Sequence, residues 1–269
     1  MHFTFSLLLL FLATFPLLAQ TKTTVTDSPE FTERRGLQLR AGMTYGFLQD
    51  LRYSPLAFSG RGQLYGLSFV KFTAERDRSF DIDVTVDKMA GGPENVARVK
   101  GITTAFTYAQ QRRVGQLIGA DWFAGGELRA AGTLYFSDAG GNNGQRPYTD
   151  VALAALSSLR FNLNGQPLTV GGGLGLLHWV QDGHSFAFAY PEHVLNGPGY
   201  SYEDAGPGSI FGRRKLTSLH ELVQLRTFVH YRPGKRIGLH YRWDLTRYAE
   251  VKGYPVTQGQ HQFLVSYTF

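Results

Sequence analysis

Long segments in which apolar and polar residues alternate are the feature that most restricts the fold of this chain. In GLQLRAGMTYGF, which begins at Gly36, every second residue is apolar and the residues between are polar or glycine. SFDIDVTVDK, LHELVQLRTFVHY and RIGLHYRWDL, which begin at Ser79, Leu219 and Arg236, repeat the pattern. Successive side chains of a strand point to opposite faces, so this period predicts β-strands with one apolar and one polar face.

Two all-β architectures produce such strands. A soluble sandwich buries the apolar face, whereas a transmembrane barrel turns it toward lipid and fills its interior with the polar set. The alternating runs exceed the roughly five or six residues of a typical globular strand, and the chain holds 32 glycines. We therefore expect an antiparallel up-and-down transmembrane β-barrel, with the soluble sandwich as the alternative. Aromatic residues placed for an interfacial girdle are Tyr45, Phe47, Tyr108, Phe161, Tyr231, Trp243, Tyr267 and Phe269.

The connections between these runs divide into short turns and long loops, as the two rims of an outer-membrane barrel require. Short turns are expected at 75–79, 110–113, 164–167 and 232–235, and long loops at 49–61, 89–96, 137–149, 181–214 and 247–257. Strands are expected near 36–48, 62–74, 79–88, 98–109, 114–136, 150–162, 168–180, 215–231, 236–246 and 258–269. Ten strands result. The segment 114–136 is too long for one crossing, and AGGE at 124–127 is a bulge or a hidden turn, so the alternatives are twelve strands or eight.

The first twenty residues, MHFTFSLLLLFLATFPLLAQ, carry no Lys, Arg, Asp or Glu and include an apolar run from Leu7 to Leu18. This length suits a secretory signal better than a membrane span, although a basic residue before the run is missing. We expect a signal peptide over 1–19, a short periplasmic lead-in over 20–35 and the barrel domain over 36–269. A single N-terminal membrane anchor is the alternative.

The composition removes several functional classes. The chain has no cysteine, which excludes disulfides, a lipid-anchored cysteine and thiolate metal sites. Its net charge is +6, but the basic residues are scattered rather than clustered, so no nucleic-acid partner is expected. No ligand spacing for a metal or cofactor is present, and we expect neither.

The segment HQFLVSYTF, from His261 to Phe269, keeps the strand pattern to its last aromatic residue. Together with the export signal and the amphipathic strands, it resembles the small, porin-like outer-membrane β-barrel proteins of Gram-negative bacteria. The resemblance implies export to the cell outer membrane, contact with outer-membrane lipid and lipopolysaccharide, and a monomeric barrel. It also implies that the barrel-assembly machinery reads Tyr267 and Phe269 as an assembly signal. On activity the resemblance is nearly silent.

If the apolar residues face lipid, the alternation places a set of charged and imidazole side chains in the lumen. About ten strands enclose little more space than side chains fill, so these groups are expected to neutralise one another as a packed polar network. A narrow path for ions or solutes and proton-transfer catalysis are the alternatives. The predicted lumen network consists of Arg40, Asp81, Asp83, Asp87, His220, Arg226, His230, His240, Arg242 and Asp244.

The longest predicted loop combines imidazoles with carboxylates, a mixture that could support acid–base chemistry. Weak catalytic candidates in and beside it are His178, His184, His193, Glu203 and Asp204. No GxSxG is present, GGGLG at 171–175 lies in a strand, and the motifs of omptin proteases or lipid A deacylases cannot be laid over the chain. A structural, surface-binding or minor pore role is therefore expected rather than an enzyme. The alternative is an outer-membrane hydrolase acting on lipid A or peptides.

Overall fold

The computed structural model describes residues 33–50, 56–91, 97–137, 145–182, 213–249 and 255–269. These residues form strands and turns, and no helix among them is long and apolar enough to cross a membrane. The strands are β1 (Arg34–Asp50), β2 (Ala57–Phe72), β3 (Arg76–Gly91), β4 (Ala97–Leu117), β5 (Ala120–Ser137), β6 (Gln145–Leu163), β7 (Gln166–Asp182), β8 (Arg213–Ser218), β9 (Leu222–Tyr231), β10 (Ile237–Tyr248) and β11 (Val256–Thr268).

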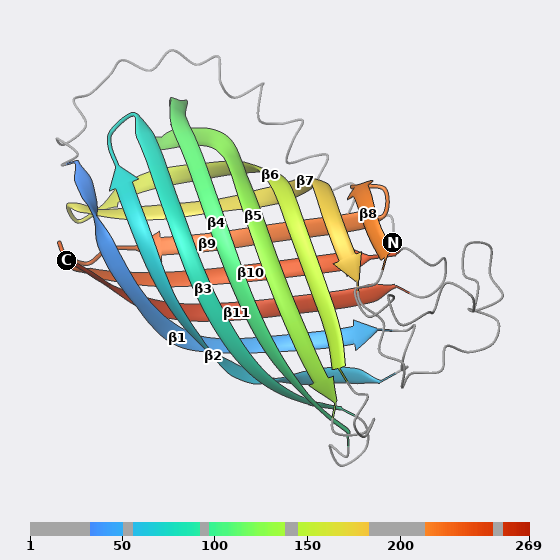
Figure 1. The fold of residues 1–269 in the computed structure, drawn as a ribbon. Helices are drawn as coiled ribbons and strands as arrows, with labels where there is room; N and C mark the ends of the chain where they lie inside the picture. The colour runs from blue at the N-terminus through green and yellow to red at the C-terminus, as the bar shows by residue number, and fades with distance from the viewer. Residues whose placement is uncertain (1–32, 51–55, 92–96, 138–144, 183–212, 250–254) are drawn as a thin grey trace.

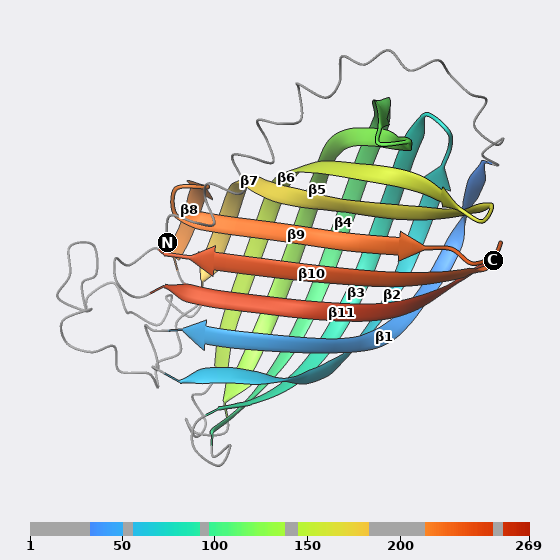
Figure 2. The same ribbon diagram turned by 180° about the vertical axis from the view of Figure 1, so that it is seen from behind.

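The strands close into a barrel (Figures 1 and 2). From β1 to β7 each strand pairs antiparallel with the next, and β9, β10 and β11 continue the order until β11 pairs with β1. β8 and β9 share one place in the wall, because β7 pairs with β9 over Leu168–Leu174 and with β8 over Leu177–Asp182. The barrel therefore has ten strand positions, which confirms the predicted class and strand count.

The closing strand pairs as its sequence pattern suggests. Leu39 of β1 lies opposite Tyr267, and the backbone N–H of Phe269 donates a hydrogen bond of 3.0 Å to the carbonyl of Leu37. The side chain of Phe269 is exposed on the outer face, where its ring packs edge-on against Tyr267 at a centroid distance of 5.2 Å. The last strand thus joins the first and presents two aromatic rings outward.

Short turns join the strands at the end of the barrel where the C-terminus lies, called the turn end below (Figure 1). The turn predicted at 110–113 is wrong, because these residues lie within β4 and the turn follows at Ile118–Gly119. Both turn residues have positive φ, 52° and 72°, as in a type I′ hairpin. AGGE at 124–127 lies inside β5 and hides no turn.

At the opposite end, called the loop end, the strands run further than the sequence pattern predicts. β2 begins at Ala57 and β6 at Gln145, inside segments expected to be loops. In the same way β3 continues to Gly91. The predicted loops were too long because the alternation on these extensions no longer follows the apolar-outside pattern used to find the strands.

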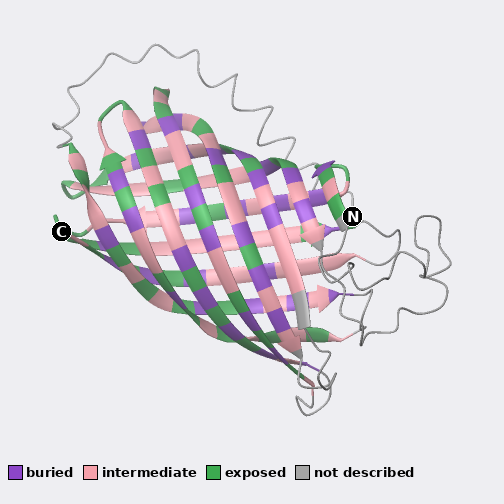
Figure 3. Cartoon of the chain, in the orientation of Figure 1, coloured by how far each residue is buried: buried purple, intermediate pink, exposed green. Residues whose placement is uncertain are grey.

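Buried and exposed residues alternate along the strands of the barrel (Figure 3), and the two faces differ in polarity. The exposed large side chains are mostly aliphatic or aromatic, such as Met43, Phe69 and Val265, whereas the interior holds buried Asp, Glu, Arg, Gln, Ser and Thr. A soluble sandwich has the reverse distribution. The observed arrangement is that of a barrel whose outer face meets an apolar medium.

The interior changes character near the loop end. Two buried apolar clusters lie there, and Val256 packs against both. The first contains Leu48, Met89, Val99 and Tyr135 with Phe58 packed against it; the second contains Val180, Leu222 and Tyr248 with Tyr148 packed against it. The lumen is thus polar along most of its length and filled by apolar side chains at the loop end.

Candidate functional site in the barrel interior

A chain of ion pairs crosses the middle of the lumen, and Arg226 of β9 is its centre. The Nε of Arg226 lies 2.6 Å from Oδ1 of Asp244 on β10, while its Nη1 donates to both carboxylate oxygens of Glu127 on β5. β5 and β9 are not neighbours in the wall. The guanidinium therefore holds together strands that no backbone hydrogen bond connects.

The chain continues through Arg242 toward the other side of the barrel. The Nε of Arg242 lies 3.1 Å from Oδ2 of Asp244, and its Nη1 lies 3.9 Å from Oδ2 of Asp83 on β3. Arg40 of β1 then places Nη2 2.7 Å from Oδ1 of Asp83 and Nη1 3.2 Å from Oδ1 of Asp81. The central ion-pair chain therefore consists of Glu127, Arg226, Asp244, Arg242, Asp83, Arg40 and Asp81.

Two further groups of polar contacts cross the lumen in addition to the central ion-pair chain. Toward the turn end, Arg160 of β6 pairs with Asp77 of β3 and donates to the carbonyl of Thr73 at 2.9 Å. Toward the loop end, Asp87 of β3 accepts from Thr44 at 2.5 Å and from Gln260 at 2.9 Å. Buried charges that are paired and hydrogen-bonded in this way avoid most of the cost of leaving water.

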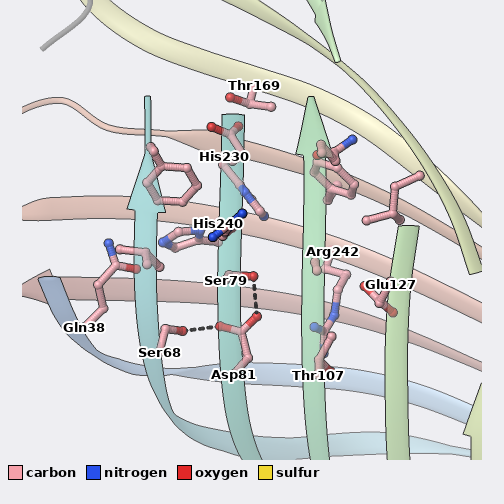
Figure 4. Close-up of a pocket in the computed structure, with 18 of the residues that line it drawn as sticks. Gln38, Ser68, Ser79, Asp81, Thr107, Glu127, Thr169, His230, His240 and Arg242 are labelled. Atoms are coloured by element: carbon pink, nitrogen blue, oxygen red, sulfur yellow. Dashed lines mark hydrogen bonds between the residues drawn. The ribbon is translucent and has the colours of Figure 1, made fainter. Parts of the chain in front are cut away.

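A cavity of about 120 Å³ remains between the central ion-pair chain and the turn end (Figure 4). His230 and His240 face it, with their rings edge-on at a centroid distance of 4.8 Å, and His240 Nε2 lies 2.7 Å from the hydroxyl of Ser266. Asp81 also borders it and accepts hydrogen bonds from Ser68 and Ser79. The cavity has room for a few water molecules and is bounded on its inner side by ion pairs.

The structure brings nine of the ten residues of the predicted lumen network to the interior face, and the three of them that lie on β3, Asp81, Asp83 and Asp87, all point inward. The exception is His220, whose predicted lumen position is wrong. It is exposed in the turn between β8 and β9, where Glu221 accepts hydrogen bonds of 2.9 Å from both Lys215 and Thr217. The pattern failed here because the strand is interrupted and its alternation restarts at Leu222.

Four of the five catalytic candidates, His184, His193, Glu203 and Asp204, lie outside the described residues. The fifth, His178 of β7, is fully buried, and its Nδ1 lies 3.0 Å from Oδ1 of Asp150 on β6. Its Nε2 has no hydrogen-bond partner among the described residues. Among these residues no group of three or more His, Asp or Glu side chains could hold a metal ion.

Sequence reasoning missed several charged residues of the interior. Glu127 was overlooked because the segment 114–136 could not be divided into strands, although it alternates with the outward Leu128. Asp77 was assigned to a turn, so its buried partner Arg160 went unnoticed. Arg232, whose guanidinium lies 3.7 Å from the ring centre of Phe72, was also assigned to a turn.

This closed ten-position barrel, apolar outside and charged inside, has the architecture of the small outer-membrane β-barrel proteins. No protein-family model matches the sequence, and no curated protein matches it either. Among solved structures, similar barrels include the translocator domain of autotransporter NalP from Neisseria meningitidis, with 12% identity over 96% of this chain and 92% of that chain at a TM-score of 0.45. The beta domain of the Bordetella autotransporter BrkA is also similar, with 14% identity over 87% of this chain and 99% of that chain and a TM-score of 0.41.

The outer membrane protease OmpT from Escherichia coli is similar at 9% identity, over 93% of this chain and 100% of that chain, with a TM-score of 0.38. Identities and TM-scores this low say nothing about what this chain does. Any function proposed for this chain must therefore rest on its own residues.

Proposed function

We propose that the protein is an integral outer-membrane β-barrel whose lumen is closed by its own side chains, and that it works as a structural or surface-binding protein rather than as an open pore. The central ion-pair chain is the observation that carries this proposal. It joins β5 to β9 and β3 to β10, pairs of strands that are not neighbours, so it obstructs the lumen. The apolar clusters at the loop end supply a second obstruction.

The height of the apolar outer band supports the membrane location. On β3 the outward residues between Arg78 and Lys88 are Phe80, Ile82, Val84 and Val86. At about 3.3 Å per residue these two basic residues stand about 33 Å apart along the strand, or about 25 Å along the membrane normal for a tilt of about 40°. This height matches the apolar band of about 25 Å that outer-membrane barrels present to lipid.

Fractionation of cells, followed by electrophoresis with and without boiling, tests the location and the fold together. We expect the protein in the outer-membrane fraction and a higher apparent mobility before boiling, because the closed barrel stays compact in detergent. In planar bilayers we expect no stepwise conductance. A soluble periplasmic protein without a mobility shift would refute the membrane location, and regular conductance steps would refute the closed lumen.

The hydrolase alternative makes a distinct prediction at His178, the one catalytic candidate within the described residues. Because His178 is fully buried and faces Asp150, we expect H178Q to leave any hydrolysis of peptide or lipid A substrates unchanged and to lower the unfolding temperature. The measurement compares hydrolysis rates and thermal unfolding of both proteins. Hydrolysis by the native protein that H178Q abolishes while the barrel stays folded would favour the enzyme instead.

A further inference from the structure

The cavity between the central ion-pair chain and the turn end is lined by nitrogen donors that the described residues do not satisfy. Gln111 of β4 is only 8% exposed, and its Nε2 is buried without a hydrogen-bond partner among these residues. Arg40 also lines the cavity, and its buried Nε lacks a partner in the same way. Buried donors are nearly always hydrogen-bonded in folded proteins, so this cavity requires an acceptor, either water or a ligand.

Arg232, which directly follows β9, adds a cation to the same cavity. Its guanidinium stacks on the ring of Phe72, 3.7 Å from the ring centre. No ion pair joins it to a carboxylate of the described residues, and Asp77, the carboxylate at this level of the cavity, is paired with Arg160. Stacking on a ring uses the flat face of a guanidinium and leaves the N–H groups at its edge available to an acceptor.

The strand register brings these donors to one level of the barrel. Phe72 lies opposite Asp77, and Asp77 lies opposite Gln111. Directly opposite residues have Cβ atoms about 5 Å apart, so Arg232 and Gln111 are placed on either side of this aspartate. His230 is two residues before Arg232 in the chain and borders the same cavity (Figure 4). A guanidinium, an amide and an imidazole thus face one space.

The carboxylates that border the cavity already have partners. Asp77, Asp81 and Glu127 each pair with an arginine, and Asp81 also accepts hydrogen bonds from two serine hydroxyls. No buried side-chain oxygen of the described residues that line the cavity lacks a hydrogen-bond partner. The cavity therefore has unsatisfied donors but no unsatisfied acceptors, which favours a ligand rich in oxygen acceptors over a cation.

The size and the position of the cavity restrict the ligand to a small one that enters from the turn end. Its volume is about 120 Å³, and a cavity of about 150 Å³ in another protein holds benzene, so an ion of about five heavy atoms fits. Phe72 and Arg232, which line the cavity near the turn end, are partly exposed to water. A small ion can therefore reach the cavity without passing the ion pairs that close the middle of the lumen.

We propose that this cavity binds a small inorganic oxyanion such as phosphate, held by the guanidinium of Arg232 and the side-chain amide of Gln111, with the imidazole of His230 beside it. A planar guanidinium donates two parallel N–H bonds to two oxygens of such an ion, and the amide N–H groups donate to another. The inference adds a ligand to the interior of the barrel and goes beyond the structural or surface-binding role proposed above.

The test titrates inorganic phosphate into the folded, full-length barrel in neutral detergent and follows binding by calorimetry. About 0.1 M sodium chloride screens long-range charge effects. We expect saturable binding that R232M weakens about tenfold or more and that Q111M, which changes no charge, weakens about fivefold. The matched control is R34M, because Arg34 lies at the same end of the barrel but donates to the carbonyl of Gly234 and does not line the cavity. R34M is expected to change the affinity less than about twofold.

Each other outcome overturns the proposal. Absence of saturable binding to the native barrel would show that water alone fills the cavity. Equal losses in R232M and R34M would show a general charge effect, and unchanged affinities in R232M and Q111M would place the phosphate elsewhere. Mobility before and after boiling confirms that each variant is folded. Conductance in planar bilayers is measured independently, so a barrel that binds phosphate but conducts ions refutes the closed lumen and not this site.

Discussion

Replacement of Arg226 by methionine is expected to lower the free energy of unfolding by about 3–5 kcal/mol, the largest loss we expect from a single charged residue of the lumen. The side chains of Arg226, Glu127 and Asp244 are only 9%, 8% and 12% exposed. R226M therefore leaves two buried carboxylates without the cation that they share. Urea-induced unfolding of the detergent-solubilised barrel, followed by tryptophan fluorescence, measures the loss.

Two further variants make the result specific to the pairing. R35M removes an exposed arginine that contacts Glu33, and we expect it to leave the unfolding curve nearly unchanged. The triple variant R226M/E127Q/D244N removes the buried charges together with the arginine and should regain much of the lost stability. If the triple variant is no more stable than R226M, the loss does not come from unpaired carboxylates.

These ion pairs matter because of which strands they connect. Backbone hydrogen bonds of a barrel join only neighbouring strands, so they leave its cross-section free to flatten. Arg226 joins β9 to β5, Arg242 joins β10 to β3, and Arg160 joins β6 to β3 across the interior. The same contacts that fix the cross-section also fill the lumen. The ion pairs therefore leave no open path through the middle of the barrel.

The alternating pattern was sufficient to predict the strands within the apolar band. On β3 every outward residue from Phe80 to Val86 is apolar, because lipid tolerates little else, and the inward carboxylates of Asp81 and Asp83 follow by alternation alone. This prediction required no knowledge of which side chains form ion pairs with one another. For the same reason it predicted which side chains face inward but not which pairs form.

The sequence pattern did not predict the features that depend on tertiary contacts. Ile118 has a positive φ, which an isoleucine rarely adopts, so only Gly119 marked the turn that divides β4 from β5, and glycines also occur inside the strands of this chain. On β3 the polarity of the two faces reverses at Lys88, which is exposed, and Met89, which lies in a buried apolar cluster, so the strand end Met89–Gly91 resembled a loop. Glu127 could be recognised as a lumen residue only once that turn was placed.

Replacement of Gly42 by alanine is the second change from which we expect a large effect, and it tests how the first and last strands close. Gly42 lies opposite Leu264 in the β1–β11 register. A Cβ at Gly42 would fall on the carbonyl oxygen of Phe263 and 2.8 Å from the Cα of Leu264. Both neighbours are backbone atoms and cannot rotate away, so the two strands must separate locally.

We expect G42A to lower the free energy of unfolding by about 1–3 kcal/mol, the usual cost of overpacking, and to lower the temperature at which the compact band disappears on electrophoresis. G132A is the matched control, because a Cβ at Gly132 in the middle of β5 would have no atom within 4 Å. Its stability should stay the same or rise slightly, since alanine has less backbone freedom than glycine to lose on folding. Equal stability of both variants would mean that the joint between β1 and β11 is looser than its register indicates, and that side-chain contacts across the lumen rather than this joint keep the barrel closed.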